Sequence, residues 1–562
     1  MKKLLIAFCT VAIFVSSTPC VSAQAPPDLV LVNGTVYTLN ENKPTAQAVS
    51  ISGGRIAAIG TTEDILAGAG AGTRVVDLHG KSVVPGFIDA HGHLINLGLS
   101  LLRLNFVGTK NYQEIVDAVA AKAESLPEGE WITGRGWDQN DWPEKTFPNH
   151  APLSGRSPYN PVALTRIDGH AMLVNAKALE LAGIDRETAD PPGGRIVRDE
   201  TGAATGVLVD RAQGLVARHI PPDTEAARRE AMALAIRECL KYGLTSVHDA
   251  GVSGADIELY KAMIDDDEFD LRVYAMIRAT DVSTVDRYFE SGPLIAYGGN
   301  RLTVRSLKAM MDGALGSRGA ALFDPYTDDP GNTGLQMMPT DELAALTVRA
   351  LEAGFQVNTH AIGDKGNHET LDAYQTALRT PSVKEKARNA RLRIEHAQVV
   401  ALNDIPRFAA LGVIPSMQAT HATSDMYWAE DRLGGNRIAG SYAWRRFLDS
   451  GSRIANGSDF PVESPNPLWG FYAAITRQDH EGWPEGGWRP GQRMTRAEAL
   501  KSFTLDAAYA AFEDGLKGSI EPGKLADIVV LSADIMKIQP AQILETEVVM
   551  TILGGKIVYE HP

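Results

Sequence analysis

The sequence predicts an α/β protein: a closed (β/α)8 barrel with an insertion after its first strand, plus a small β-sandwich composed of N- and C-terminal segments. Through the middle of the chain, strand-like apolar runs alternate with helix-like stretches, as in βα units with a parallel sheet. Short strand-like runs separated by glycines occupy both ends. With 44% hydrophobic and 22% charged residues, the composition excludes a disordered, collagen-like or coiled-coil chain.

Residues 1–23 have the pattern of a secretory signal peptide. Lys2 and Lys3 precede a short apolar run, and small residues ending at Ala23 follow it. The apolar run is too short to span a membrane. We therefore expect cleavage after Ala23 and an exported protein, periplasmic or secreted, without a membrane anchor. A lipid anchor on Cys20 is the competing interpretation, which the residues before that cysteine disfavour.

The two ends of the mature chain, residues 27–84 and 515–562, are expected to form one composite β-sandwich. Their strand-like runs are residues 29–32, 35–38, 48–51, 55–59, 74–78, 527–531, 548–553 and 556–559. Few short strands are stable alone, so pairing of the two segments is the simplest arrangement.

Residues 85–514 are expected to form the barrel. Its strand-like runs begin just before that boundary and are residues 83–89, 245–249, 271–277, 304–312, 355–360, 392–396, 413–418 and 453–459. Helix-like stretches lie between them, at residues 224–242, 341–353, 369–378 and 443–449. The interval after the first run is too long for one crossover. It predicts an insertion at about residues 106–221, which contains a further strand-like run at 161–167.

The formal charge of −15, from 54 basic and 69 acidic side chains, argues against nucleic acid or an anionic membrane as partner. A small-molecule substrate is the expected partner, and a homo-oligomer is left open. After loss of the leader, Cys239 is the only cysteine, so no intrachain disulfide can form.

Histidines and an aspartate stand where the barrel strands are expected to end. His91 and His93 follow the first run, and residues two apart on a strand share one face. His360, His396 and Asp459 end the fifth, sixth and eighth runs, where barrel enzymes carry their catalytic groups. Imidazole and carboxylate are ligands of Zn²⁺ and similar ions. The pattern predicts a site for one or two divalent ions, with zinc the first candidate.

Lys308 lies inside the fourth strand-like run, where an ammonium facing the barrel interior would be costly. A desolvated lysine tends to be neutral, and a neutral amine can take up carbon dioxide to become a carbamate that bridges two metals. The alternative is a solvent-facing or salt-bridged lysine. Without carboxylation of Lys308, a single metal is expected.

These motifs together resemble the amidohydrolase superfamily. In chain order they are residues 85–89 with His91-Gly92-His93, residues 308–318, Thr359-His360 through Asp364, Glu395-His396, Asn456 through Asp459 and Pro461, and residues 518–528. The resemblance covers essentially the whole mature chain and is nearest to the branch of N-substituted formamide deformylases and YtcJ-like exported amidohydrolases.

The resemblance implies a role for each candidate ligand: His91 and His93 on the more buried metal, His360 and His396 on the second, Lys308 as the carboxylated bridge, and Asp459 as metal ligand and proton shuttle. The implied function is an exported hydrolase that cleaves an amide-type C–N bond of an acyl or formyl amine. A lactonase, esterase or deaminase, or an exported binding protein without turnover, stays open, because one fold supports many chemistries.

Five further residues are weaker substrate-binding candidates. His170, His248 and His421 resemble substrate-facing positions of this branch, although a lone histidine is more often structural. Trp137 and Asp138 lie in the insertion, either in a lid over the site or in a packed aromatic turn.

Overall fold

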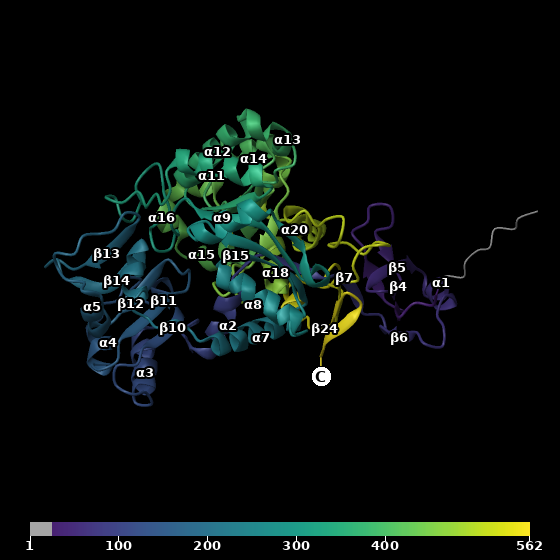
Figure 1. Ribbon diagram of the computed structural model, residues 1–562, viewed down its shortest axis with the longest axis horizontal. Coiled ribbons are helices and arrows are strands. Elements are labelled where there is room, and N and C mark those ends of the chain that lie inside the picture. The colour runs from purple at the N-terminus through teal and green to yellow at the C-terminus, as the bar shows by residue number, and fades with distance from the viewer. Residues whose placement is uncertain (1–24, 562) are drawn as a thin grey trace, which may run out of the picture.

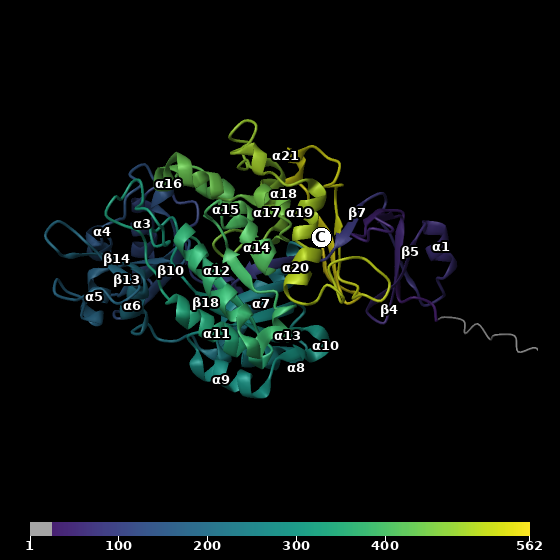
Figure 2. The ribbon, with the colours of Figure 1, turned by 90° about the horizontal axis from the view of Figure 1, so that it is seen from above.

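The computed structural model describes residues 25–561, so the predicted signal peptide lies outside the described residues. Along the long axis of the molecule, the insertion, the barrel and the terminal strands follow one another (Figures 1 and 2). The insertion and the terminal strands therefore lie at opposite ends of the barrel.

Within residues 25–561 there is no helix with the length and apolar character needed to cross a membrane.

Eight parallel strands form the barrel, which confirms the predicted (β/α)8 fold. In chain order they are β8 (Phe87–Gly92), β15 (Leu244–Val252), β16 (Arg272–Arg278), β18 (Leu302–Met310), β19 (Gln356–Ala361), β20 (Arg393–His396), β21 (Ile414–Gln418) and β22 (Ala455–Gly457). The ring closes between its last and first strands, where the Asp459 N–H donates to the His91 carbonyl at 2.7 Å. A short strand, β17 (Leu294–Ala296), pairs antiparallel with β18.

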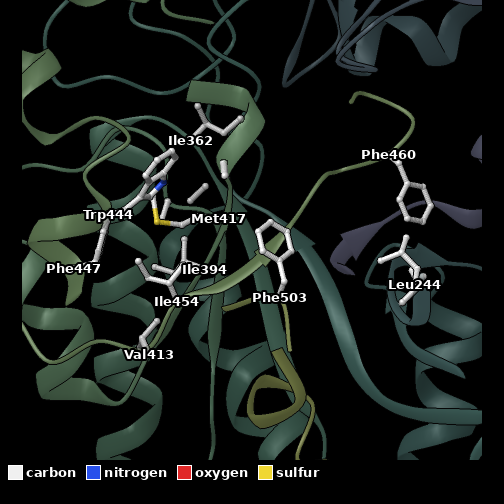
Figure 3. Close-up of a cluster of buried hydrophobic side chains, with 14 of the residues drawn as sticks. Leu244, Ile362, Ile394, Val413, Met417, Trp444, Phe447, Ile454, Phe460 and Phe503 are labelled. Atoms are coloured by element: carbon white, nitrogen blue, oxygen red, sulfur yellow. The ribbon is translucent and has the colours of Figure 1, made fainter. Parts of the chain in front are cut away.

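Helices surround the barrel and bury its outer face. The longer ones are α2 (Leu94–Leu102), α7 (Glu225–Lys241), α8 (Gly254–Asp265), α9 (Val282–Ser291), α11 (Thr340–Ala353), α12 (Asp364–Arg379), α16 (Ala429–Arg437) and α18 (Pro467–Thr476). Shorter ones are α10 (Tyr297–Asn300), α13 (Lys384–Ala387), α14 (Ile405–Leu411), α15 (Ala419–Asp425), α17 (Trp444–Asp449), α19 (Arg496–Ser502), α20 (Leu505–Ala510) and α21 (Pro540–Ile543). Figure 3 shows how Ile394 and Met417 of the strands lie near Trp444 and Phe447 of α17 in the buried core.

The first strand-like run divides into two strands that belong to different sheets. β7 (Ser82–Pro85) joins the terminal strands, whereas β8 begins the barrel. Gly86 lies between them, and a Cβ there would come within 2.2 Å of the Thr245 hydroxyl oxygen. A glycine therefore lets the chain pass close to β15 as it changes sheets.

The two ends of the chain share one core. One sheet has the order β5-β4-β1-β6 and the other the order β25-β24-β23-β7-β2-β3. The strands are β1 (Leu29–Val32), β2 (Thr35–Tyr37), β3 (Thr45–Ala46), β4 (Ala48–Ser52), β5 (Arg55–Gly60), β6 (Arg74–Asp77), β23 (Ile528–Leu531), β24 (Val548–Leu553) and β25 (Lys556–Glu560), with helix α1 (Thr62–Ala67). Side chains of both sheets, among them Leu31, Val83 and Ile528, form one apolar cluster.

The insertion contains a six-stranded sheet with its own core. Its order is β13-β14-β12-β11-β10-β9, from strands β9 (Leu104–Asn105), β10 (Ile132–Trp137), β11 (Val162–Arg166), β12 (Ala171–Val174), β13 (Gly194–Arg198) and β14 (Ala204–Asp210). Helices α3 (Tyr112–Ala123), α4 (Ala151–Arg156), α5 (Ala176–Ala182) and α6 (Gly214–Ala217) accompany it. Trp137 is fully buried in this core and its indole N–H donates to the Leu164 carbonyl at 2.8 Å. The ring of Trp137 is therefore enclosed in the packed core of the insertion, which is the second of the two alternatives considered for it.

Candidate metal centre

The predicted ligands lie together at the C-terminal ends of the barrel strands. His396 is the last residue of β20, and His91 and His360 are the next-to-last residues of β8 and β19. His93 directly follows β8, and Asp459 lies two residues after the end of β22. Both His396 and Asp459 have positive φ, 74° and 59°. Such backbone strain away from glycine is found preferentially at functional sites.

The tightest group of donor atoms comes from His91, His93 and Asp459. Nε2 of His93 lies 3.0 Å from Oδ1 of Asp459, and Nε2 of His91 lies 3.6 Å from the same oxygen. Lys308 Nζ lies 3.0 Å from Nε2 of His91. Among the described residues, this Asp459 oxygen has no partner with hydrogen-bond geometry. A buried, unsatisfied carboxylate oxygen facing two imidazole nitrogens suits a cation better than an empty cavity.

The outer ring nitrogens are held by neighbours, which fixes the direction of each imidazole. His93 Nδ1 bonds the Ala250 carbonyl at 2.8 Å, and His396 Nδ1 bonds the Gln418 amide oxygen at 2.8 Å. His91 Nδ1 bonds the Glu395 carboxylate. For His91 and His93, Nε2 is therefore the nitrogen that faces the centre, the usual arrangement of histidines that bind metals.

Glu395 is a functional residue that the sequence analysis did not assign. Its carboxylate pairs with Arg393, Nε to Oε1 at 2.8 Å, and both side chains are fully buried. Burial would raise the pKa of Glu395, but Arg393 and His91 hold it well below its usual range. Successive residues of a strand normally face opposite sides of the sheet. The placement of His396 at the centre therefore predicted that Glu395 would face away from it. The positive φ of His396 ends that alternation.

A second group of donor atoms contains His396, His421 and Asp459. His421 Nε2 lies 3.9 Å and His396 Nδ1 4.0 Å from Oδ2 of Asp459. His360 stands beside this group, with its ring centroid 4.5 Å from that of His396 and its Nε2 3.6 Å from Asp312 Oδ1. The structure therefore brings His421, expected to face substrate, as near to Asp459 as His396 is.

Burial sets the protonation of the site. It lowers the pKa of His91 to about 4 and the pKa values of His360 and His396 well below the usual range, so these imidazoles are neutral. It also lowers the pKa of Lys308 to about 8. For Asp459, burial opposes ionisation, but the surrounding imidazoles hold its pKa well below the ordinary value. Neutral imidazoles beside an anionic carboxylate form a suitable donor set for a divalent ion.

Two cavities meet at this centre, one of about 730 Å³ and one of about 100 Å³. Both are lined by Asp168, His170, Val462 and three of the candidate ligands, His360, His396 and Asp459. The insertion supplies His170, whose Nδ1 lies 2.6 Å from Oδ1 of Asp210. His360, His396 and Asp459 therefore form part of the wall between the two cavities, and His170 of the insertion lies beside them.

Three of the other weak candidates reach these cavities and one does not. His170 lines both, while Asp138 and His421 line the small one. His248 has no exposed surface, accepts from Arg393 at 3.0 Å and packs against Tyr274 inside the barrel. The ring of His248 therefore lies in the barrel core and lines neither cavity, a position that does not support the substrate contact considered for it.

Comparison with known proteins defines the class. Residues 74–559 match the model of the amidohydrolase family, and the chain belongs to that family. This confirms the resemblance inferred from the motifs. The chain is 35% identical to Protein LONG AFTER FAR-RED 3 of Arabidopsis thaliana, covering 95% of this chain and 91% of that one. It is 33% identical to the putative amidohydrolase YtcJ of Bacillus subtilis, covering 94% and 98%.

A further relative is the N-substituted formamide deformylase of Arthrobacter pascens, 28% identical over 95% of this chain and 98% of the relative. Among solved structures, an uncharacterized metal-dependent hydrolase from Pyrococcus furiosus has a TM-score of 0.70 at 28% identity, covering 91% of this chain and 100% of that one. Another, from Pyrococcus horikoshii, has a TM-score of 0.72 at 27% identity, covering 91% and 99%. These likenesses extend over nearly the whole described chain.

Proposed function

We propose that this protein is a metal-dependent hydrolase that cleaves an amide-type C–N bond in a small acyl or formyl amine. The observation that carries the proposal is the convergence of His91, His93 and Asp459 at the wall of the large cavity, with Asp459 also lining the small one. The deformylase named above supports the choice of bond. The predicted leader supports action outside the cytoplasm.

The residues present fit a divalent ion. His91, His93 and Asp459 would hold one, and His396 with His421 or His360 would contribute to a second. The donor set of neutral imidazole and carboxylate favours zinc. The lowered pKa of Lys308 supports its carboxylation, which would provide a bridge between two ions. When bound, such an ion supplies an activated water and polarises the substrate carbonyl.

The chain's own groups handle the proton and the orientation of the ligands. Asp459 is anionic, and its two carboxylate oxygens lie beside the two groups of metal-ligand atoms. This carboxylate would therefore accept the proton lost by water and then donate it to the leaving amine. Glu395 holds His91 with Nε2 toward the centre. His170, fixed by Asp210, presents its other nitrogen to the space where substrate binds.

The test is metal content and turnover measured together. Mature protein purified without chelator, from cells grown with bicarbonate, is analysed by elemental mass spectrometry and assayed on formamides, acyl amines and lactones. We expect metal and release of amine, and Asp459→Asn should abolish release while the exposed control Asp449→Asn does not. Protein that takes up no metal even after its addition, and turns over none of these substrates, would instead be a binding protein.

A further inference from the structure

Arg135 is a cation of the insertion that lies beside the candidate metal centre. It belongs to β10, which Figure 1 shows on the side of the insertion that faces the barrel. Arg135 lines the large cavity together with His93 and Asp459. Its Nη2 donates to the Ile167 carbonyl at 2.7 Å, and its Nη1 donates to the Pro461 carbonyl. Because Pro461 lies two residues after Asp459, these bonds hold Arg135 close to the candidate ligands.

A β-bulge turns Arg135 away from the core of the insertion. Ile132 and Trp137 both lie in that core, although residues five apart on a regular strand face opposite sides. The pairing of β10 with β11 shifts by one residue between Arg135 and Trp137, which leaves Gly136 unpaired at φ 97°. Bulges next to active sites often re-aim a side chain in this way. Trp137 is thereby packed in the core, and Arg135 is left on the opposite face.

Arg135 has no acidic partner within residues 25–561. It forms no ion pair, and its two carbonyl bonds use two of the five N–H groups of a guanidinium. Burial lowers the pKa of Arg135 to about 10, and the more distant charges of Asp459 and Asp168 oppose that change. Asp168 is paired with Arg166 instead, at 2.6 Å. The half-buried Arg135 stays charged near neutral pH, so its remaining donors suit an anion.

The acids that line the large cavity have partners, whereas its arginines lack acidic ones. Besides Asp459, four acids line it, and each has a partner in the described chain: Asp168 bonds Arg166, Asp210 bonds His170, Asp249 bonds Tyr260, and Asp256 pairs with Arg228. The wall has two other arginines, Arg211 and Arg278. Both are exposed and donate only to main-chain carbonyls, at 2.7 and 3.2 Å. Arg135 is the half-buried one of the three, and the charge left free for a ligand in this wall is positive.

We propose that Arg135 binds a carboxylate of the substrate, which would then be an acyl or formyl amine with an acidic group close to the scissile bond. The inference rests on the proposed function for the position of that bond. A divalent ion held by His91, His93 and Asp459 would offset the charge of Asp459, which makes an anion beside Arg135 more favourable. The large cavity, about 730 Å³, has the size of an ordinary ligand site. Arg135 would determine specificity, because a neutral analogue leaves its free donors without a charged acceptor.

The test compares two ligands of the same shape and different charge. Levulinate has a ketone in place of the scissile amide and a carboxylate two carbons away, and levulinamide is its neutral counterpart. Both are titrated by calorimetry into mature, zinc-loaded protein, and the levulinamide recovered afterwards is checked to be intact. Binding of the carboxylate is thereby measured without turnover of an acyl amine.

The variants are Arg135→Gln, which removes the charge, and Arg135→Lys, which keeps it. The matched control is Arg198→Gln. Arg198 is another half-buried arginine of the insertion that donates only to main-chain carbonyls, those of Asp185, Thr188 and Gly202, and it lines neither cavity. Levulinamide binding, zinc content and thermal unfolding of each variant report whether the site is intact.

We expect levulinate to bind about tenfold more tightly than levulinamide, because a charge-assisted hydrogen bond replaces a neutral one. Arg135→Gln should remove most of that preference, Arg135→Lys should keep more of it, and Arg198→Gln should leave it unchanged. Equal affinity for the two ligands overturns the proposal, as does equal loss of preference in the two Arg135 variants. An unchanged preference in Arg135→Gln also overturns it, since the carboxylate then binds the zinc ion or the exposed arginines.

The result is separate from that of the proposed function. Hydrolysis of neutral acyl amines by a protein that does not prefer levulinate refutes this inference alone. Selective binding of levulinate by a protein that hydrolyses no acyl amine refutes only the proposed function.

Discussion

Glu395 provides the sharpest test of how this chain prepares its metal centre. Replacement by glutamine keeps the size of the side chain but removes the charge between His91 and Arg393. A glutamine amide can donate to His91 Nδ1, which would favour the tautomer whose Nε2 carries hydrogen and cannot bind metal. Loss of such an orienting carboxylate typically weakens metal binding by about 10- to 100-fold.

The same change should also lower the free energy of unfolding. Arg393 is fully buried, and breaking a buried pair by removing one partner costs about 3–5 kcal/mol because the other charge stays uncompensated. Two measurements separate the effects. Zinc affinity is obtained by competition with a chelator, and the unfolding free energy of the metal-free protein is obtained in urea.

A matched control lies at the opposite end of the barrel. Asp527 pairs with buried Arg272 at 2.6 and 2.8 Å, away from the candidate ligands. Asp527→Asn should cost comparable stability and leave zinc affinity unchanged. If Glu395→Gln binds zinc as tightly as the parent protein, or if Asp527→Asn weakens binding equally, the orienting role of Glu395 is refuted.

Three other predictions follow from particular contacts. Lys308→Met should reduce the zinc content of protein grown with bicarbonate from two ions to one if carboxylated Lys308 bridges them; an unchanged content measured by mass spectrometry excludes the bridge. Gly98→Ala would place a Cβ 1.9 Å from the Ala231 carbonyl oxygen where α2 meets α7, and overpacking should cost about 1–3 kcal/mol in thermal unfolding. Gly72→Ala, which meets open space, should cost less than about 0.5 kcal/mol, and equal losses would contradict the packing argument. Glu498, bonded to Arg445 and Thr495, has its pKa lowered to about 2, so its contribution is complete above the unfolded value near 4.5 and is lost as the pH falls toward 2. Glu498→Gln should therefore cost about 1 kcal/mol at pH 7 and nothing measurable near pH 2, as followed by urea unfolding at both pH values.

The sequence by itself determined the barrel and the order of its strands. Each run of apolar residues bounded by turn signals was long enough to specify a buried parallel strand, and His91, His360, His396 and Asp459 mark the ends of strands. In a (β/α)8 barrel those ends meet, so the histidines could be grouped without coordinates. The family motifs lie on the same segments and pointed to the same class.

Only the tertiary structure showed which segments pack together around these strand ends and which residues line the cavities. Periodicity could not show that Gly86 sends one apolar run into two sheets, because close approach to Thr245 is a contact between distant segments. It also could not show that Trp137 packs inside the insertion. Asp141 and Glu463 are more than three hundred residues apart, and only folding of the insertion onto the barrel brings both to one cavity. Local pattern specifies elements, whereas the charge and shape of a site depend on contacts between remote segments.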